Sequence, residues 1–358
     1  MARPPFRYGD LIGQRRAIEY LLGLVAGTMR LKDALPNILF CGPPGYGKTE
    51  IAMTVSKPTG TTFRKVNASS RFPLTEFLKI FDDIKYGDIL FVDEAHALRP
   101  DLQLVLCSAM EERSVPVLER IGKRTPYITS ANKPIPEFAT FLATDQPDRL
   151  PDALRSRIAI TIELRPYTTA EMRAIVEVFC EAKNLSVTGH AVSLLAAASH
   201  STPREARNFV QALYCLNGGA VNPLQRSDVL AFLERNGLDE ALLGEQAQIY
   251  LAALLDEDGP ARPEALAARL GRRPRWMKET ERHLLEKRLI RFTQNGRVLT
   301  ADGRKQALRI RREREVRDVD DQADDLGADT PAGTPAAEAS TFPATPELKD
   351  GSSDGVVS

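Results

Sequence analysis

The chain of 358 residues lacks several features that mark specialised classes of protein. No stretch approaches the roughly eighteen apolar residues that a membrane span needs, and the first residues lack the apolar core of a secretory signal. The four cysteines form no CxxC pair, so neither a disulfide framework nor a zinc site is expected. A composition of 43% hydrophobic and 27% charged residues excludes a fibrous or wholly disordered chain. We therefore expect a cytoplasmic protein with several ordinary globular domains.

The net charge is zero, from 48 basic and 48 acidic side chains, but these are segregated along the chain. Residues 262–317 carry eighteen basic and seven acidic side chains, a net of +11. Residues 318–358 carry ten acidic side chains and one basic, a net of −9. So dense a basic module favours a polyanionic partner such as nucleic acid; a solvated charged surface is the alternative.

The first half of the chain has the pattern of a parallel sheet with helices on both faces. Apolar positions between residues 10 and 35 recur at helical spacing. Short apolar runs of strand length follow at Asn37–Cys41, Ile89–Val92, Phe141–Thr144 and Ile158–Ile162. Because apolar strands that alternate with helices are typical of α/β folds, we predict such a domain over residues 1–165.

The second half predicts three further parts. Helical periodicity from Thr169 to about Leu233 indicates an all-α domain over 166–237. Residues 238–310 read as three helices (241–255, 263–270 and 274–287) and two short strands around Asn295-Gly296, which predicts a winged helix. Residues 311–358 have almost no large apolar side chains, and we expect a disordered acidic tail.

Residues 42–49 read GPPGYGKT and fit the pattern G-x-x-x-x-G-K-[ST] between a predicted strand and a predicted helix. Glycines let backbone N–H groups surround a phosphate, and the helix presents its positive N-terminus to it. Lys48 would neutralise the β- and γ-phosphate oxygens, and the Thr49 hydroxyl would bind Mg²⁺. The predicted ATP-binding residues are Gly42, Pro43, Pro44, Gly45, Tyr46, Gly47, Lys48, Thr49 and Glu50.

Residues 89–96 read ILFVDEAH and place two carboxylates at the carboxyl end of a predicted strand, where ligands of such sheets bind. Asp93 would hold Mg²⁺, and Glu94 would polarise the water that attacks the γ-phosphate. His96 has two interpretations: a hydrogen-bonded structural residue, or a participant in the chemistry.

The order of these motifs resembles that of AAA+ ATPases, and within them the RuvB family of hexameric motors of Holliday-junction branch migration. The resemblance spans residues 3–310. It rests on LIGQ at 11–14, GPPGYGKT at 42–49, ILFVDEAH at 89–96, AMEE at 109–112, LRSR at 154–157, TPR at 202–204 and NGRV at 295–298. This order, with a winged helix after a helical lid, is more selective than the phosphate-binding motif alone.

The resemblance implies roles for residues around the nucleotide. Leu11 and Ile12 would line the adenine pocket. Arg204 would be sensor 2, which reads the nucleotide from the helical lid. Thr144 would be sensor 1, although residues 144–146 read TDQ where the family usually has Thr-Thr-Arg.

The resemblance also implies an arginine finger, which enters the neighbouring subunit's site and stabilises transition-state charge. Arg155 and Arg157 are the candidates, and Arg157 matches the more finger-like position. A ring of identical subunits, hexameric in the family, is therefore expected.

In the family a protruding β-hairpin binds the partner RuvA, and it corresponds here to residues 115–136. Strand-like segments at Val117-Leu118 and Tyr127–Thr129 favour a hairpin, with a basic turn at Gly122–Arg124. This tip differs from the apolar, glycine-containing tip usual in the family. A RuvA-like partner and service in another system, such as a mobile element or a defence module, both stay open.

The third predicted helix of the basic module opens with the sequence RRPRWMK at residues 272–278. Cations there would contact DNA backbone phosphates, which position a protein without reading sequence. Arg297 would enter a minor groove. The expected DNA-binding residues are Arg272, Arg273, Arg275, Lys278 and Arg297; a winged helix used only for protein contacts is the alternative.

Together these features predict an ATP-driven ring that translocates duplex DNA and drives branch migration in recombination and repair. The alternative is an AAA+ switch or loader that binds ATP and DNA but only assembles partners. A protein remodeller fits less well, because the sequence has no apparent aromatic pore loop or peptide-handling domain.

Overall fold

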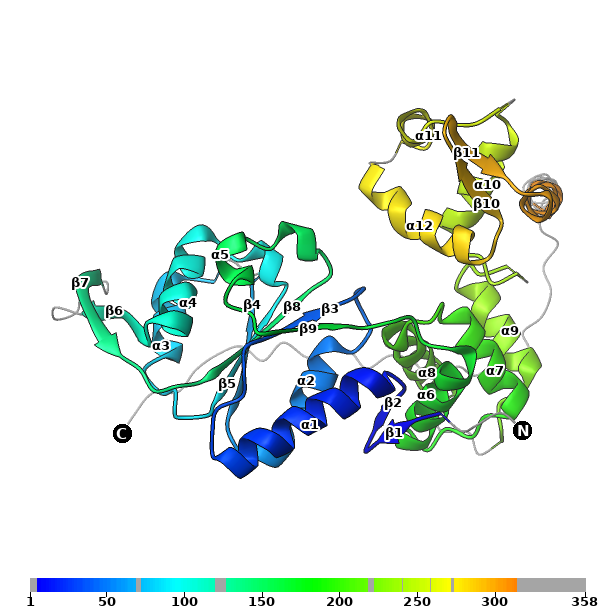
Figure 1. Ribbon diagram of the computed structural model, residues 1–358. Coiled ribbons are helices and arrows are strands. Elements are labelled where there is room, and N and C mark those ends of the chain that lie inside the picture. Colours follow the sequence, from blue (N-terminus) through cyan, green and yellow to red (C-terminus); the bar gives the residue numbers. More distant parts are fainter. Residues whose placement is uncertain are drawn as a thin grey trace, which may run out of the picture. The chain divides into compact units, whose positions relative to one another are not determined.

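The computed structural model (Figure 1) describes residues 5–68, 72–119, 127–217, 222–239, 241–257, 259–271 and 274–313. The chain divides into two compact units, residues 1–247 and 248–358. The division falls within α10 (Glu245–Leu255), so the segment 166–237 that was expected as a separate domain lies in the first unit.

A five-stranded parallel sheet forms the centre of the first unit. Its strand order is β4 (Phe63–Asn67), β5 (Ile89–Asp93), β8 (Ala139–Thr144), β3 (Ile38–Cys41) and β9 (Ile160–Glu163). Helices α1 (Arg15–Leu31) and α2 (Lys48–Ser56) contribute to one core cluster, and α3 (Leu74–Ile80) and α4 (Pro100–Glu111) to the other.

Alternate residues of each central strand belong to different cores. Phe40, Phe91 and Phe141 join the α1–α2 core, whereas their neighbours Leu39, Leu90 and Leu142 join the α3–α4 core. Burial on both faces explains why these strands read as continuous apolar runs, and the predicted sheet is confirmed. Strand β4 was not predicted, because its sequence FRKVN buries only Val66 at the edge of the sheet.

Four helices follow β9, as the periodicity of residues 169–233 predicted: α6 (Thr169–Ala182), α7 (Gly189–Ala198), α8 (Pro203–Asn217) and α9 (Arg226–Arg235). A capping box between Thr168 and Glu171 begins α6, and Arg165 donates two hydrogen bonds to the same carboxylate at 2.5 and 2.9 Å. Burial acts to raise the pKa of Glu171, but the bonds from Arg165 and Thr168 outweigh it and lower the pKa. These contacts hold the beginning of α6 against the segment that follows β9.

Two hairpins extend the first unit. Strands β1 (Arg7–Tyr8) and β2 (Leu11–Ile12) pair before α1. Strands β6 (Ser114–Glu119) and β7 (Tyr127–Pro134) form the hairpin predicted in residues 115–136, whose expected basic turn lies outside the described residues. Beyond β8 come the short 3-10 helix η3 (Pro147–Arg149) and the short α-helix α5 (Asp152–Arg155).

The second unit contains most of α10, then α11 (Pro263–Arg269), α12 (Pro274–Glu286) and the hairpin of β10 (Ile290–Thr293) and β11 (Gly296–Leu299). The Asn-Gly signal located this hairpin, but Gly296 lies in β11 rather than in the two-residue turn. Its φ is 142°, and a Cβ there would lie 2.3 Å from the Ala261 carbonyl oxygen. Close approach of residue 261, which exchanges backbone hydrogen bonds with Arg297, therefore requires the glycine.

Residues 301–313 are helical and follow directly on the hairpin. The helix therefore includes residues 311–313, the first three residues of the expected acidic tail. The remaining residues of the expected tail, 314–358, lie outside the described residues.

Candidate nucleotide-binding site

The glycine-rich loop joins β3 to α2 and surrounds the end of Lys48. The Lys48 Nζ donates to the carbonyl oxygens of Gly42 at 2.6 Å and Pro43 at 3.0 Å. Gly45 and Gly47 have φ of 82° and 83°, a conformation that glycine adopts without strain. No side chain caps α2, so its first N–H groups are available to an anion.

The expected metal-binding residues meet at the carboxyl end of β5. The Thr49 hydroxyl donates to Asp93 Oδ2 at 3.3 Å. A hydroxyl and a carboxylate are oxygen ligands that Mg²⁺ prefers, so these residues fit the ion. Lys65 Nζ lies 3.1 Å from the same Asp93 oxygen and was not predicted, since a lysine on an edge strand belongs to no motif. Burial lowers the pKa of Lys48, while nearby carboxylates, Asp93 among them, oppose the shift.

His96 lies in the turn η2 (Ala95–Ala97) between the expected catalytic carboxylate and sensor 1. Its side chain is 6% exposed, and its Nδ1 is 2.9 Å from the Thr144 Oγ1. Its Nε2 is 3.2 Å from Gln146 Nε2 and 3.6 Å from Glu94 Oε2. The structure therefore bears out a hydrogen-bonded role for His96 and places it beside the expected chemistry.

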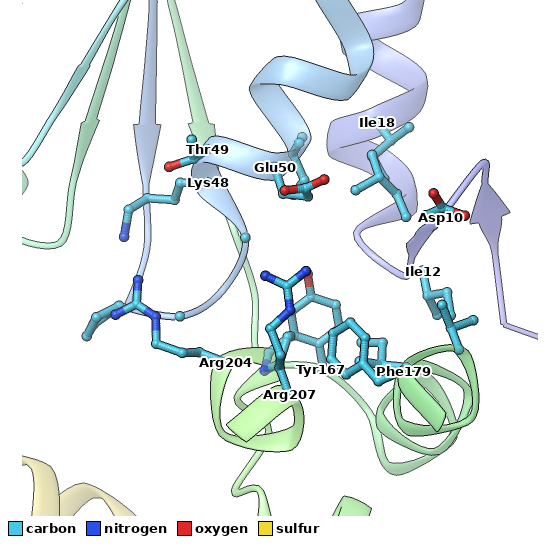
Figure 2. A pocket seen from close by; sticks show the side chains of 18 of the residues that line it. Asp10, Ile12, Ile18, Lys48, Thr49, Glu50, Tyr167, Phe179, Arg204 and Arg207 are labelled. Atoms are coloured by element: carbon cyan, nitrogen blue, oxygen red, sulfur yellow. The ribbon is translucent and has the colours of Figure 1, made fainter. Parts of the chain in front are cut away.

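A pocket of about 590 Å³ opens over these motifs (Figure 2). Figure 2 shows Arg204 of α8 pointing toward Lys48 and Arg207 of the same helix pointing toward Glu50, with Ile12 at the other end. The predicted residues that line the pocket are Leu11, Ile12, Pro44, Gly45, Gly47, Lys48, Thr49, Glu50, Asp93, Glu94 and Arg204.

Three predicted binding residues, Gly42, Pro43 and Tyr46, do not line this pocket, and neither does the predicted sensor Thr144, which is buried. Tyr46 is buried, its ring meets that of Tyr167 edge-on at 5.9 Å, and its carbonyl accepts a bond from the Tyr167 hydroxyl at 3.0 Å. The ring and the backbone carbonyl of Tyr46 therefore anchor the loop to the segment before α6, and its nucleotide-binding role stays a prediction.

The sequence missed Arg207, whose guanidinium lies 5.4 Å from the centre of the Phe179 ring on the pocket wall. Arg207 follows Arg204 by one helical turn, so periodicity could have found it. The loop also touches this helix directly: a Cβ on Gly45 would lie 2.7 Å from the Thr202 Cγ2 and 3.0 Å from the Arg204 Cβ.

The two candidate arginine fingers lie away from the pocket of their own chain. Arg155 donates to the Pro147 carbonyl at 2.7 Å. Arg157 pairs with Glu111 at the end of α4 and donates to the Ala153 carbonyl at 2.5 Å. Neither lines the pocket.

The expected DNA-binding residues have mixed outcomes. Lys278 is exposed on α12, whereas Arg272 and Arg273 and the side chain of Arg275 lie outside the described residues. Arg297 donates to both carboxylate oxygens of Glu281, at 2.8 and 3.2 Å, and stacks over Phe292 with 4.5 Å to the ring centre. In this structure the Arg297 guanidinium is held in an ion pair inside the unit, and its minor-groove role stays a prediction.

Across the described ranges, none of the helices combines the length and the apolar character needed to cross a membrane.

Comparison with known proteins identifies similar chains. The family model "Holliday junction DNA helicase RuvB P-loop domain" matches residues 3–164. The Holliday junction branch migration complex subunit RuvB of Pseudothermotoga lettingae is 30% identical over 301 residues, which cover 81% of this chain and 85% of that protein. The corresponding subunit of Paramagnetospirillum magneticum is 29% identical over 308 residues, covering 85% and 88%.

Solved structures agree with these sequence matches. The Thermotoga maritima RuvB Holliday junction branch migration motor is 26% identical, with a TM-score of 0.66 over 82% of this chain and 94% of that one. A mutant form of Thermotoga maritima RuvB gives a TM-score of 0.69 at 25% identity, with 82% and 95% covered.

Proposed function

The chain belongs to the RuvB family of Holliday junction branch-migration proteins, and we propose that it is an ATP-driven motor that moves duplex DNA at four-way junctions. The observation that carries the proposal is the pocket, which Lys48, Thr49 and Asp93 line from the sheet side and Arg204 lines from α8, with Arg204 pointing toward Lys48. ATP would bind there together with Mg²⁺.

Each residue of the site would have a separate role in phosphoryl transfer. Lys48, which now donates to its own loop, would turn its ammonium to the β- and γ-phosphate oxygens. Thr49 and Asp93 would hold Mg²⁺, which when bound neutralises charge on the phosphate oxygens. Glu94, 43% exposed and free to reach a water, would orient that water for in-line attack, and Thr144 would read the γ-phosphate.

Lid position would report the state of the nucleotide. Arg204 reaches the pocket from α8, and the loop at Gly45 packs against Thr202 and Arg204. A change in phosphate contacts would therefore act directly on the lid helices, which is the kind of differential contact that drives a domain movement.

A ring of identical subunits, hexameric by analogy with the family, would complete the site. Arg155 and Arg157 do not line their own pocket, which supports action on a neighbour's nucleotide. Arg157 is the better candidate from the sequence, and its pairing with Glu111 at the end of α4 would hold it at the subunit surface.

The second unit would be a winged helix that holds DNA through phosphate contacts. Its helices and terminal hairpin have the order of that fold, Lys278 is exposed on α12, and Arg272, Arg273 and Arg275 lie within six residues of it in the sequence. Such contacts carry little sequence information, and translocation on any sequence requires that property. The β6–β7 hairpin would meet a RuvA-like partner.

Two variants test the proposed chemistry. We expect Lys48→Ala to abolish ATP binding, because the phosphate charge loses its partner. Glu94→Gln should retain binding but lose turnover, because the amide cannot polarise water. Equilibrium nucleotide binding and steady-state ATP hydrolysis measure the two effects, and Glu177→Gln on the exposed face of α6 is the matched control. Hydrolysis by Glu94→Gln at the parental rate would refute the assignment of Glu94.

A further inference from the structure

The residues after Thr144 form a hydrogen-bond chain in which the direction of each bond can be assigned. Arg149 Nη1 lies 3.0 Å from Gln146 Oε1, and a guanidinium can only donate. Oε1 is thus the acceptor of the Gln146 amide, which fixes the amide orientation. Gln146 Nε2 must then donate, and its neighbours are Asp145 Oδ1 at 3.1 Å and His96 Nε2 at 3.2 Å.

The donating amide determines the tautomer of His96. Because Gln146 Nε2 donates, His96 Nε2 accepts, and a neutral ring carries its proton on Nδ1. His96 Nδ1–H then donates to Thr144 Oγ1 at 2.9 Å, and the Gln146 backbone N–H donates to the same oxygen at 2.9 Å. Both lone pairs of the Thr144 hydroxyl are thereby occupied, and its own hydrogen is left to donate elsewhere.

This arrangement also governs Glu94. His96 Nε2 lies 3.6 Å from Glu94 Oε2 but presents a lone pair to it, so the ring gives the carboxylate no hydrogen bond. In the opposite tautomer, or with a doubly protonated ring, an N–H on Nε2 would attract the carboxylate away from water.

We propose that His96 is a positioning residue: fixed by Gln146, it makes Thr144 a pure hydrogen-bond donor toward the γ-phosphate and leaves Glu94 free to orient water. The inference rests on the proposed ATPase function and deepens it. A guanidinium at position 146 would donate in the same way as the Gln146 amide and would fix the same tautomer of His96.

The test exchanges donor and acceptor in the hydrogen bond between residue 146 and His96, and it keeps the size and shape of the side chain at position 146. Gln146→Glu replaces the donating amide with an accepting carboxylate, which forces a proton onto His96 Nε2. Gln146→Arg keeps a donor at this position. Gln211→Glu, the same chemical change on the exposed face of α8, is the matched control for the added charge.

We expect Gln146→Glu to lower kcat for ATP hydrolysis by at least about tenfold, since a wrongly held histidine tautomer is costly in catalysis. Its equilibrium affinity for ATP and its thermal unfolding midpoint should stay near those of the parent, because the pocket walls are unchanged. Gln146→Arg should lose much less, and Gln211→Glu should keep the parental kcat.

A second measurement separates positioning from a loss of packing. Thr144→Val removes the hydroxyl that His96 would orient. It should lower kcat by about 10²- to 10³-fold, as for removal of one preorganised donor. With Thr144→Val in place, adding Gln146→Glu should cause a smaller fold-loss than in the parent, since only the effect on Glu94 then remains.

Each outcome has a distinct meaning. A parental kcat in Gln146→Glu would overturn the positioning role of His96 and leave the proposed function standing. So would a double variant whose fold-loss in kcat equals the product of the losses of the two single variants. Equal losses in Gln146→Glu and Gln146→Arg would also overturn it, because donor polarity would then be irrelevant. A parent protein that binds no ATP and hydrolyses none would overturn the proposed function itself.

Discussion

Substitution of Arg297 tests whether this residue stabilises the second unit or contacts DNA. Glu281 is 7% exposed at its side chain, and its described partners are the Arg297 guanidinium and the Tyr250 hydroxyl at 2.7 Å. Burial and the nearby Glu281 carboxylate raise the pKa of Tyr250, so its hydroxyl remains a donor at neutral pH. Arg297→Met would keep the aliphatic stem but leave Glu281 with the tyrosine alone.

The expected cost follows from the burial of Glu281. Removing one partner of a buried ion pair typically costs about 3–5 kcal/mol, because the remaining charge is uncompensated. One kcal/mol shifts the melting temperature of a unit this size by about 4–8 °C, so the transition should fall by at least about 12 °C. Calorimetry of the full chain, with hydrogen exchange of the β10–β11 peptides, measures the change and locates it.

Two further variants make the test decisive. Arg297→Met combined with Glu281→Gln should recover much of the loss, since no buried charge is left unpaired. Arg291→Met, on the exposed side of β10, should change stability by less than about 0.5 kcal/mol. If Arg297→Met melts normally and keeps full exchange protection yet loses DNA affinity, the structural assignment of Arg297 is wrong.

Three other predictions concern the lid, the ring and the tail. Gly45→Ala should weaken ATP affinity about 5- to 150-fold by calorimetry, since its Cβ would lie 2.7 Å from the Thr202 Cγ2 at a φ of 82° and such strain costs about 1–3 kcal/mol. Parental affinity would contradict the close packing of the loop against Thr202 and Arg204. Mixing Arg157→Ala with Lys48→Ala subunits should restore part of the hydrolysis, because some interfaces would pair an intact Arg157 with an intact phosphate site. No recovery at any ratio, with mixed assembly verified, would count against a finger that acts in trans. Truncation after Arg317 should tighten DNA binding at low salt by removing the net charge of −9, and the gain should shrink as salt rises because exposed charges are screened beyond about 8 Å at physiological salt. Identical affinities and salt slopes would instead assign the tail a solubilising role.

The parts that could be predicted from the sequence are those whose chemistry is local. Lys48 and Thr49 are adjacent in one loop, and Asp93 ends one strand, so contiguous motifs suffice to find them. The buried strands were equally readable, because burial on both faces makes each an apolar run. The edge strand β4 was missed because it lacks that property.

What the sequence could not provide depends on contacts between distant segments. Lys65 reaches Asp93 only because β4 pairs with β5. The sequence marked residues 145–146 as a departure from the family, but the meaning of Gln146 appears only when η2 brings His96 against it. The ion pair of Arg297 could not be predicted for the same reason, since Glu281 comes from another element of the unit.

The central claim is tested most directly by ATP-dependent movement of a synthetic four-way junction with homologous arms. The isolated protein, with and without a RuvA-type partner, would be given ATP or ADP, and Glu94→Gln would serve as the hydrolysis-deficient control. We predict that junctions move and resolve into duplex products only with ATP and only with an intact Glu94. Hydrolysis of ATP with stable DNA binding but no junction movement under either condition would contradict the account and favour a loader that only assembles partners.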